Sequence, residues 1–382
     1  LWGKNDGSWL KSANIVGINV RSLRSFWNIV KYVLSLPSTQ NAIHLLPIWE
    51  PGVVGSLYGM SSWRINKEFY DSSLSQVLPH LDTVEKQLRA VVNIVHVTGR
   101  AMGMDVVPHT DRFSEMAFLY PEHFEWLQRE DTEIVDHRAN LHEEVQRRIF
   151  SFLKRRASPS LESVEDLFGR GVGEKERELY IFGDPDDGLL RKKRREALVR
   201  ELNKYGLEPV PATMAPPYRG LQIDRSPNAR REDSKGMVWR DYSIQSPQPM
   251  SRVFGPLARY KLYERKNDNI DWEIDFSRPR KAAWSYVCDH YAKVQECFGF
   301  DFMRGDMSHV QMRPEGPCSS DEEFYDLLGK VKEEIREKRG VRHFAYFAES
   351  FLAPRGTMCY GDELHHLEVS QADAALGDLQ ST

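Results

Sequence analysis

The run Phe298-Gly-Phe-Asp-Phe-Met-Arg304 is a nearly continuous apolar segment that ends in charge, since Gly305 and Asp306 follow it. Such near-continuous apolar strands are typical of a parallel sheet that helices cover. A helix pattern from Arg280 to Glu296, with Pro279 at its start, leads directly into this run. The order helix then strand indicates a right-handed βαβ unit.

Further runs of the same kind occur along the chain, separated by helix-like patterns. They are Asn14–Arg21, Ala42–Trp49, Met102–Pro108, His343–Ala348 and, more weakly, Ala374–Leu379. Capping boxes formed by Asp82 with Glu85 and by Ser320 with Glu323 are expected to start two of the helices. Gly340 is expected to stop the second of them. The alternation predicts an α/β fold with a parallel sheet.

One long segment breaks this alternation. Residues 113–275 separate the third run from the helix before the fourth, and they contain helix patterns followed by proline-rich sequence. We interpret this segment as an inserted subdomain, flanked by a first barrel part at 1–112 and a second at 276–382. Its basic run Arg191-Lys-Lys-Arg-Arg195 lies beside Glu196 and Glu201 on a helix pattern, so we expect a solvated helix face rather than a nucleic-acid patch.

The composition excludes several classes of protein. The 382 residues carry 52 basic and 56 acidic side chains, and the net charge of -4 argues against a dedicated nucleic-acid partner. No window approaches the roughly 20 apolar residues that cross a bilayer. The four cysteines show no CxxC spacing, which favours reduced thiols in a reducing compartment and so a cytoplasmic location.

Polar side chains gather where the apolar runs end. Asp105 and His109 close the third run, Arg304 and Asp306 the fourth, and Glu349 the fifth. In a βα barrel, catalytic groups collect at these carboxyl ends of the strands.

Two of these carboxylates are expected to differ in their surroundings. Arg304 and Asp306 are two residues apart, so in extended chain they point to the same side. The guanidinium is then expected to keep Asp306 ionised, as a nucleophile requires. Glu349 follows apolar residues, and partial burial would raise its pKa and suit a general acid. Such a pair is what cleavage of a glycosidic bond with retention of configuration needs.

Four motifs carry a resemblance to a known family. Phe300-Asp-Phe-Met-Arg-Gly-Asp306 resembles a fourth-strand motif that ends Phe-Arg-x-Asp, with Met in place of the Phe. Phe347-Ala-Glu349 resembles a fifth-strand acid/base motif, and Asp105-Val-Val-Pro-His109 a third-strand Asp…Asn-His motif. The segment Ser56–Phe69 is similar to a tyrosine-bearing loop after the second strand. All four stand in the order found in the α-amylase family of retaining glycoside hydrolases.

The resemblance implies a (β/α)8 TIM-type barrel with a long insertion after the third strand. It implies Asp306 as nucleophile, Glu349 as general acid/base and Arg304 as the partner of Asp306. It places Asp105 and His109 in the sugar-binding site and stacks Tyr58 on the sugar. The implied activity is the cleavage or transfer of α-glucosidic bonds in an oligosaccharide or glucoside. Hydrolase, transglycosylase and phosphorylase remain open.

The chain departs from the family pattern in three places. Pro108 stands where the family has Asn, which counts against the calcium site often built there, so we expect no cofactor and no metal. The third motif is also one residue short, so that Met104 takes the usual Asp position. The seventh-strand Asp of the family has no counterpart, and we expect a fragment, truncated after about the sixth strand and inactive alone.

Two alternatives stay open. One is a non-catalytic barrel that binds a sugar or a protein partner. The other is a metal-dependent hydrolase, in which Asp105, His109 and another His would converge on a metal. Trp49, Trp63 and Trp126 are equally compatible with sugar-stacking platforms and with core packing.

Overall fold

The computed structural model describes most of the chain and divides it into two compact units. The described residues are 6–156, 161–214, 220–247, 251–307, 313, 318, 322–350, 365, 367 and 371–375. The first unit comprises Leu1–Pro51, Trp63–Pro108 and Trp284–Thr382, and the second comprises Gly52–Ser62 and His109–Ala283. The predicted division at 112/113 and 275/276 stays a prediction.

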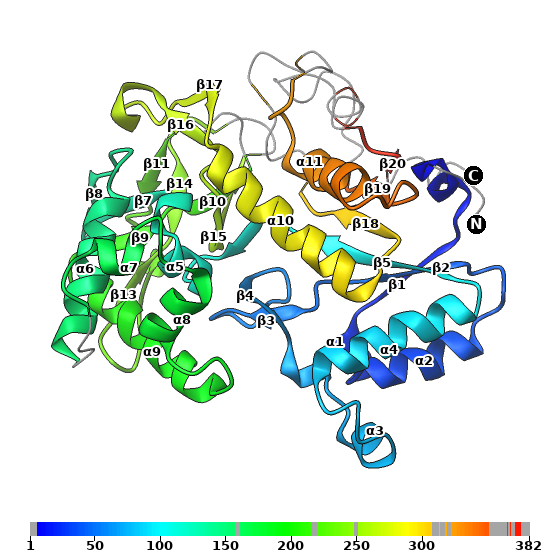
Figure 1. The fold of residues 1–382 in the computed structure, drawn as a ribbon. Coiled ribbons are helices and arrows are strands. Elements are labelled where there is room, and N and C mark those ends of the chain that lie inside the picture. Colours follow the sequence, from blue (N-terminus) through cyan, green and yellow to red (C-terminus); the bar gives the residue numbers. More distant parts are fainter. Residues whose placement is uncertain are drawn as a thin grey trace. The chain divides into compact units, whose positions relative to one another are not determined.

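A six-stranded parallel sheet forms the centre of the first unit (Figure 1). Its strands are β1 (Ile15–Ile18), β2 (Ala42–Leu45), β5 (Ala101–Val106), β18 (Phe302–Gly305), β19 (Ala345–Ala348) and β20 (Ala374–Ala375). Each pairs in parallel with the next, in chain order. All six predicted strands are present, although residues 376–379 of the sixth prediction lie outside the described residues. An order without reversal is that of a βα barrel, because a doubly wound sheet changes direction at a switch point.

The helices of this unit connect the strands, as the βαβ pattern predicts. They are α1 (Val20–Leu23), α2 (Phe26–Ser35), α3 (Ser72–Val77), α4 (Val84–Val97), α10 (Lys281–Phe298) and α11 (Leu327–Glu333). Short elements complete it: η1 (Gly7–Ser12), η2 (Lys67–Phe69), η6 (Glu334–Lys338), β3 (Trp49–Pro51) and β4 (Met60–Ile65). Figure 1 shows α2 and α4 side by side along the β1–β2–β5 part of the sheet.

The predicted capping boxes are wrong, while the predicted stop is confirmed. Thr83 caps α4 by accepting from Lys86 N, and Asp82 forms an ion pair with the Lys86 ammonium instead. Asp326 caps α11, so the helix begins after the predicted box, of which Ser320 lies outside the described residues. In both cases the residue directly before the helix accepts the hydrogen bond from a free amide group of the first turn. Gly340 has φ +72°, the left-handed conformation that ends a helix.

One face of the sheet carries the core of the first unit at its amino end. The cluster consists of Trp9, Leu10, Ala42, Ala101, Phe302, Ala345, Phe347 and Ala374. Gly103 makes room for it, because a Cβ there would lie 2.3 Å from the ring of Phe302. Alternate residues of a strand share a face. The positions that continue this face toward the carboxyl ends are Asp105, Arg304 and Glu349.

The second unit is built mainly from small antiparallel sheets and helices. Its sheets are β10 (Pro211–Met214), β15 (Arg252–Arg259) and β6 (His109–Asp111); β8 (Glu133–Asp136), β7 (Trp126–Glu130) and β9 (Leu207–Pro209); β11 (Leu221–Ile223) with β14 (Tyr242–Ile244); β12 (Arg230–Glu232) with β13 (Val238–Arg240); and β16 (Tyr263–Arg265) with β17 (Ile274–Pro279). Its helices are α5 (Glu115–Leu119), α6 (His142–Arg155), α7 (Glu165–Phe168), α8 (Glu174–Phe182) and α9 (Gly188–Asn203), with η3 (Pro121–His123), η4 (Pro227–Ala229) and η5 (Lys266–Asn269).

The solvated face expected for the basic run 191–195 is only partly present. The run lies on α9, where Lys192 and Lys193 are exposed. Arg191 and Arg195 are buried, because Glu115 of α5 lies below them and forms an ion pair with Arg191. A buried acidic partner from a distant segment is not visible in a local charge pattern.

Several smaller expectations can be compared with the structure. Trp49 and Trp126 are buried, whereas Trp63 is half-buried and stacks on His290. Cys288, Cys297 and Cys318 are free thiols, and Cys359 lies outside the described residues. Within the described part of the chain, no helix has the length and apolar character to cross a membrane.

Candidate active site

Polar side chains meet at the carboxyl ends of β5, β18 and β19 in the first unit. Asp105 and Arg304 stand opposite each other in the register of β5 and β18. The ladder continues beyond the strands, since Asp306 N donates to Val106 O at 2.9 Å and Glu349 N to Gly305 O at 3.1 Å. Because parallel strands end at one edge of a sheet, the chain brings these side chains together from three distant segments.

The guanidinium of Arg304 joins the cluster. Its Nη1 lies 3.1 Å from Asp105 Oδ1 and 2.7 Å from Asp306 Oδ1. Its Nη2 lies 2.7 Å from Glu349 Oε1. The planar fork of an arginine suits such bridging, because its two terminal nitrogens point at different acceptors. The expectation that Arg304 and Asp306 point to the same side is therefore confirmed.

A second contact holds the Glu349 side chain to the backbone of the loop after β18. Met307 N donates to Glu349 Oε2 at 2.7 Å. Met307 has φ +49°, a left-handed conformation that is uncommon for a residue with a side chain. Strained residues of this kind gather at functional sites, where the surrounding structure holds them.

Both carboxyl groups are harder to ionise than free ones. Burial raises the pKa of Asp306 to about 6, although the positive charge of Arg304 opposes the shift. Burial also raises the pKa of Glu349, and the negative charge of Asp306 adds to this shift. The raised pKa expected for Glu349 is confirmed. The pKa of Asp306 is raised as well, because burial outweighs the charge of Arg304, and the sequence showed the arginine but not the depth of burial.

The two carboxyl groups also influence each other's ionisation. The negative charge of Asp306 adds to the effect of burial on the pKa of Glu349. Two neighbouring carboxyls of raised pKa favour a state in which one is protonated and the other is ionised, because like charges repel.

His44 is a member of the cluster that the sequence did not reveal. Its Nε2 lies 3.2 Å from Asp105 Oδ1, and both side chains are buried. The side chain of Asp105 is fully buried, and its Oδ2 has no hydrogen-bond partner among the described residues. His44 stands within an apolar run, where it looked like an interruption. His44 pairs with Gly103 in the register of β2 and β5, so it lies on the same face of the sheet as Asp105. The alternation of faces along the strand was the signal that could have identified it.

The two other predicted site residues belong to the second unit. His109 is buried on β6, and its Nε2 lies 3.1 Å from the backbone oxygen of Tyr58. Asp111, two residues along, accepts from Val53 N at 3.2 Å and from Phe113 N at 3.1 Å. Burial raises the pKa of Asp111 to about 6. Asp111 therefore fixes the loop that precedes Tyr58.

Metal-binding side chains do not gather in the part of the chain that the structure describes. No group of three or more His, Cys, Asp or Glu residues there has the arrangement to hold an ion. Pro108 occupies the position where the family motif has Asn, as the sequence shows. The alternative of a metal-dependent hydrolase, in which Asp105, His109 and another His converge on a metal, finds no support among the described residues.

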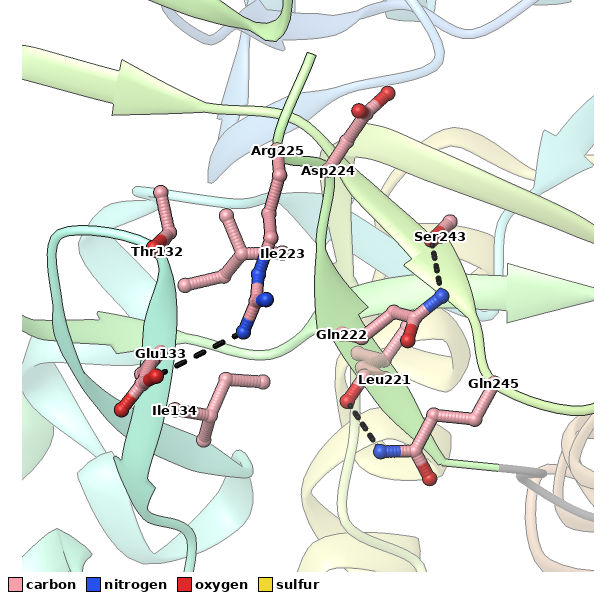
Figure 2. Close-up of a pocket in the computed structure, with 10 residues that line it drawn as sticks. All are labelled: Thr132, Glu133, Ile134, Leu221, Gln222, Ile223, Asp224, Arg225, Ser243 and Gln245. Carbon is pink, nitrogen blue, oxygen red and sulfur yellow. Dashed lines mark hydrogen bonds and ion pairs between the residues drawn. The ribbon is translucent and has the colours of Figure 1, made fainter.

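The second unit contains a cavity of its own (Figure 2). It measures about 600 Å³ and opens between β8 and the paired strands β11 and β14. Gln222 donates to Ser243 at 3.2 Å, and Arg225 lies 3.7 Å from Glu133. The one arginine that lines it, Arg225, is thus paired, and no two carboxyls of its lining are bridged by an arginine as Asp306 and Glu349 are by Arg304.

Comparison with known proteins gives only remote likenesses. No family model matches the chain, and no curated protein does. Among solved structures, trehalose-6-phosphate hydrolase of Bacillus licheniformis is 13% identical with a TM-score of 0.42, and the match covers 91% of this chain and 45% of that one. A maltogenic α-amylase of Thermotoga neapolitana is 12% identical with a TM-score of 0.40, covering 89% and 46%. Isomaltulose synthase of Protaminobacter rubrum is 11% identical with a TM-score of 0.41, covering 91% and 46%.

These solved structures include α-amylases, the family that the motifs resemble. The chain spans about half the length of each. At this level of similarity they carry no argument about activity, which rests on the geometry around Arg304.

Proposed function

We propose that this chain supplies the nucleophile and the acid/base of a carbohydrate-active enzyme that cleaves or transfers α-glucosidic bonds with retention of configuration. One observation carries the proposal: a single guanidinium, that of Arg304, binds Asp306 and Glu349 at the ends of neighbouring parallel strands. Burial raises the pKa of both carboxyls, and their mutual repulsion favours one acid and one base at the same moment. Double displacement needs that pair of states.

In the first step, Asp306 attacks the anomeric carbon and forms a glycosyl ester. The bond from that carbon to the glycosidic oxygen breaks, and Glu349 gives its proton to the departing oxygen. In the second step, Glu349 takes a proton from the acceptor, whose oxygen displaces Asp306. Water as acceptor makes a hydrolase, a sugar makes a transglycosylase and phosphate makes a phosphorylase.

The remaining residues take supporting roles in this proposal. Arg304 keeps part of the Asp306 population ionised, because its charge opposes the effect of burial on the pKa of Asp306. Asp105, fully buried behind Arg304, is a positioning residue that fixes the guanidinium, and His44 fixes Asp105 in turn. Tyr58 and His109 are proposed to bind the sugar, and the eight-stranded barrel is the proposed frame.

Azide rescue of the full-length protein tests the two assignments separately. With α-glucosyl fluoride as substrate, Glu349→Ala is expected to form α-glucosyl azide, because azide replaces the second nucleophile after Asp306 has reacted. Asp306→Ala is expected to form β-glucosyl azide, because azide then attacks directly. Glu337→Gln, an exposed carboxylate of η6 in the same unit, is the control and should behave as wild type.

The opposite pattern of azide products would contradict the assignment. Binding of glucosides with no turnover in any form of the full-length protein would favour the non-catalytic barrel instead.

A further inference from the structure

A second, smaller cavity of the second unit has a different chemistry from the one in Figure 2. It measures about 410 Å³, within the usual range for small-molecule sites. Its walls come from three segments: the loop at Gly52 and Val53, one side of α9, and the β12–β13 hairpin. We call it the basic pocket.

Positive charge is in excess in the basic pocket. Four basic side chains line it against two acidic ones, and they are Lys192, Arg195, Arg200 and Lys235 against Glu196 and Asp233. Arg200 is neutralised, since its Nη1 lies 2.9 Å from Asp233 Oδ2. Lys235 is only loosely paired, at 4.0 Å from Glu196. The pocket therefore keeps positive charge that internal pairing does not cancel.

Arg195 and Lys192 provide that remaining charge. The Arg195 side chain is 11% exposed, and its closest ion pair is 3.9 Å from Glu115, whose other oxygen Arg191 already holds. Lys192, one helical turn before it, makes no ion pair with any residue that the structure describes. Arg195 also acts on the buried Asp111, whose pKa it lowers against the effect of burial. The exposed ammonium of Lys192 has no fixed anionic partner among the described residues, so an anion in the basic pocket would pair with it.

An aromatic ring gives the basic pocket a second kind of surface. Trp239 lines it and is half-buried, held edge-on against Phe113 at 5.1 Å. An indole held in this way offers a rigid flat face to an apolar ring surface. The C–H face of a sugar is such a surface, whereas a bare inorganic ion makes no use of it.

The basic pocket also adjoins the proposed sugar-binding residues of the same unit. Val53, in its wall, donates to Asp111, and Asp111 lies on β6 with His109. His109 in turn contacts Tyr58 O. A ligand in the basic pocket therefore lies along the same loop that presents Tyr58.

We propose that the basic pocket binds a phosphorylated sugar, with the phosphate between Lys192 and Arg195 and the sugar ring on Trp239. A phosphate ester carries about -1.5 to -2 charges near neutral pH and offers three acceptor oxygens, which suits two or three cationic donors. A neutral sugar leaves the cations unsatisfied, and a carboxylate brings only one charge.

Titration calorimetry on the full chain tests the proposal, with glucose 6-phosphate, α-glucose 1-phosphate, glucose, glucuronate and inorganic phosphate as probes. At least one sugar phosphate is expected to bind about tenfold or more tightly than the other three. Lys192→Gln and Trp239→Leu should each weaken that binding about tenfold. Binding should also weaken as salt rises, because the contact is largely ionic.

Two controls keep the result specific. Lys193→Gln changes the neighbouring exposed lysine of α9, and Arg225→Gln changes the arginine of the Figure 2 cavity, so both should bind as wild type. Asp306→Asn should also leave binding unchanged, which separates this proposal from the proposed catalysis.

Four results would overturn the proposal: no sugar phosphate binds, glucose or glucuronate binds as tightly, inorganic phosphate alone binds as tightly, or Asp306→Asn abolishes binding. The last would place the ligand at the Arg304 cluster.

Discussion

Arg304 is the residue on which the proposed chemistry depends. It touches Asp105, Asp306 and Glu349 with two nitrogens, and its side chain is only 14% exposed. A buried cation with three acidic neighbours is stable, and its removal would leave like charges facing one another. The three carboxyl groups are therefore held at one point by a single side chain.

Replacing Arg304 with lysine tests this dependence. An ammonium is a point charge and does not bridge two carboxyls as a planar fork does. We expect kcat/KM to fall by about 10²-fold or more, roughly 3 kcal/mol. The pKa of Asp306 should rise above about 6, because the charge that opposes the effect of burial is displaced.

The measurement is the pH dependence of kcat/KM for Arg304→Lys in the full-length protein. Its acidic limb should move to higher pH than in wild type, since a protonated Asp306 is not a nucleophile. Arg339→Lys, which alters an exposed ion pair with Glu296 in the same unit, is the control. An unchanged limb in Arg304→Lys would show that Asp306 is not the group that titrates.

Some residues of the candidate site could be predicted from the sequence and others could not. Arg304, Asp306 and Glu349 were found because strand-end polar residues stand out after apolar runs. The pKa of Asp306 was misjudged, since burial depends on residues far along the chain. His44 was missed because one histidine in an apolar strand has no pattern of its own.

Among the secondary-structure elements, β5 and β18 show how a glycine in one strand makes room for an aromatic ring of the next. Gly103 and Phe302 are paired in register, and the ring lies over the glycine. A methyl group at Gly103 would meet ring carbons at 2.3 Å. Backbone positions in a paired central strand cannot move far, so the ring would have to leave its place.

Gly103→Ala is therefore expected to destabilise the protein by about 1–3 kcal/mol, the usual cost of overpacking a core. Chemical denaturation followed by circular dichroism measures it. Gly255→Ala is the matched control, because that strand glycine of β15 has open space around it. Adding Phe302→Leu to Gly103→Ala should recover part of the loss, and an additive further loss would contradict the account.

Element types were predictable from the sequence where one physical signal dominated. The six strands followed from apolar runs of six to eight residues, a length typical of buried strands. Their ends and the helix caps were less predictable, because Asp82 and Thr83 compete for the same amides at the start of α4. Arg191 of α9 was expected on an exposed face, but it is buried against Glu115, which lies 76 residues away in the chain.

The whole molecule contains buried histidines that make its stability depend on pH. Burial lowers the pKa of His123 to about 3 and that of His142 to about 4, with nearby positive charges adding to the effect. The unfolded chain protonates these histidines near pH 6.5, so it binds more protons than the folded chain below that pH. The burial of these neutral histidines therefore contributes to the free energy of unfolding above pH 6.5. That contribution is lost as the pH falls toward 4 and 3.

His123→Gln tests this contribution, because glutamine keeps polar groups without the titration. Between pH 7 and pH 4 the wild type should lose roughly 3 kcal/mol more stability than the variant. Urea denaturation at several pH values measures the difference. His80→Gln, an exposed histidine of the first unit, should keep the wild-type slope. Equal slopes for wild type and His123→Gln would contradict the account.

The proposed mechanism places a covalent glycosyl intermediate on the side chain of Asp306. Mass spectrometry of the full-length protein after incubation with an activated fluoro-glucoside can detect this intermediate. We predict one added glycosyl group, located by peptide sequencing on Asp306 and absent from Asp306→Asn. A protein that turns over the substrate without this adduct, or that carries the sugar on another residue, would contradict the assignment of Asp306 as nucleophile.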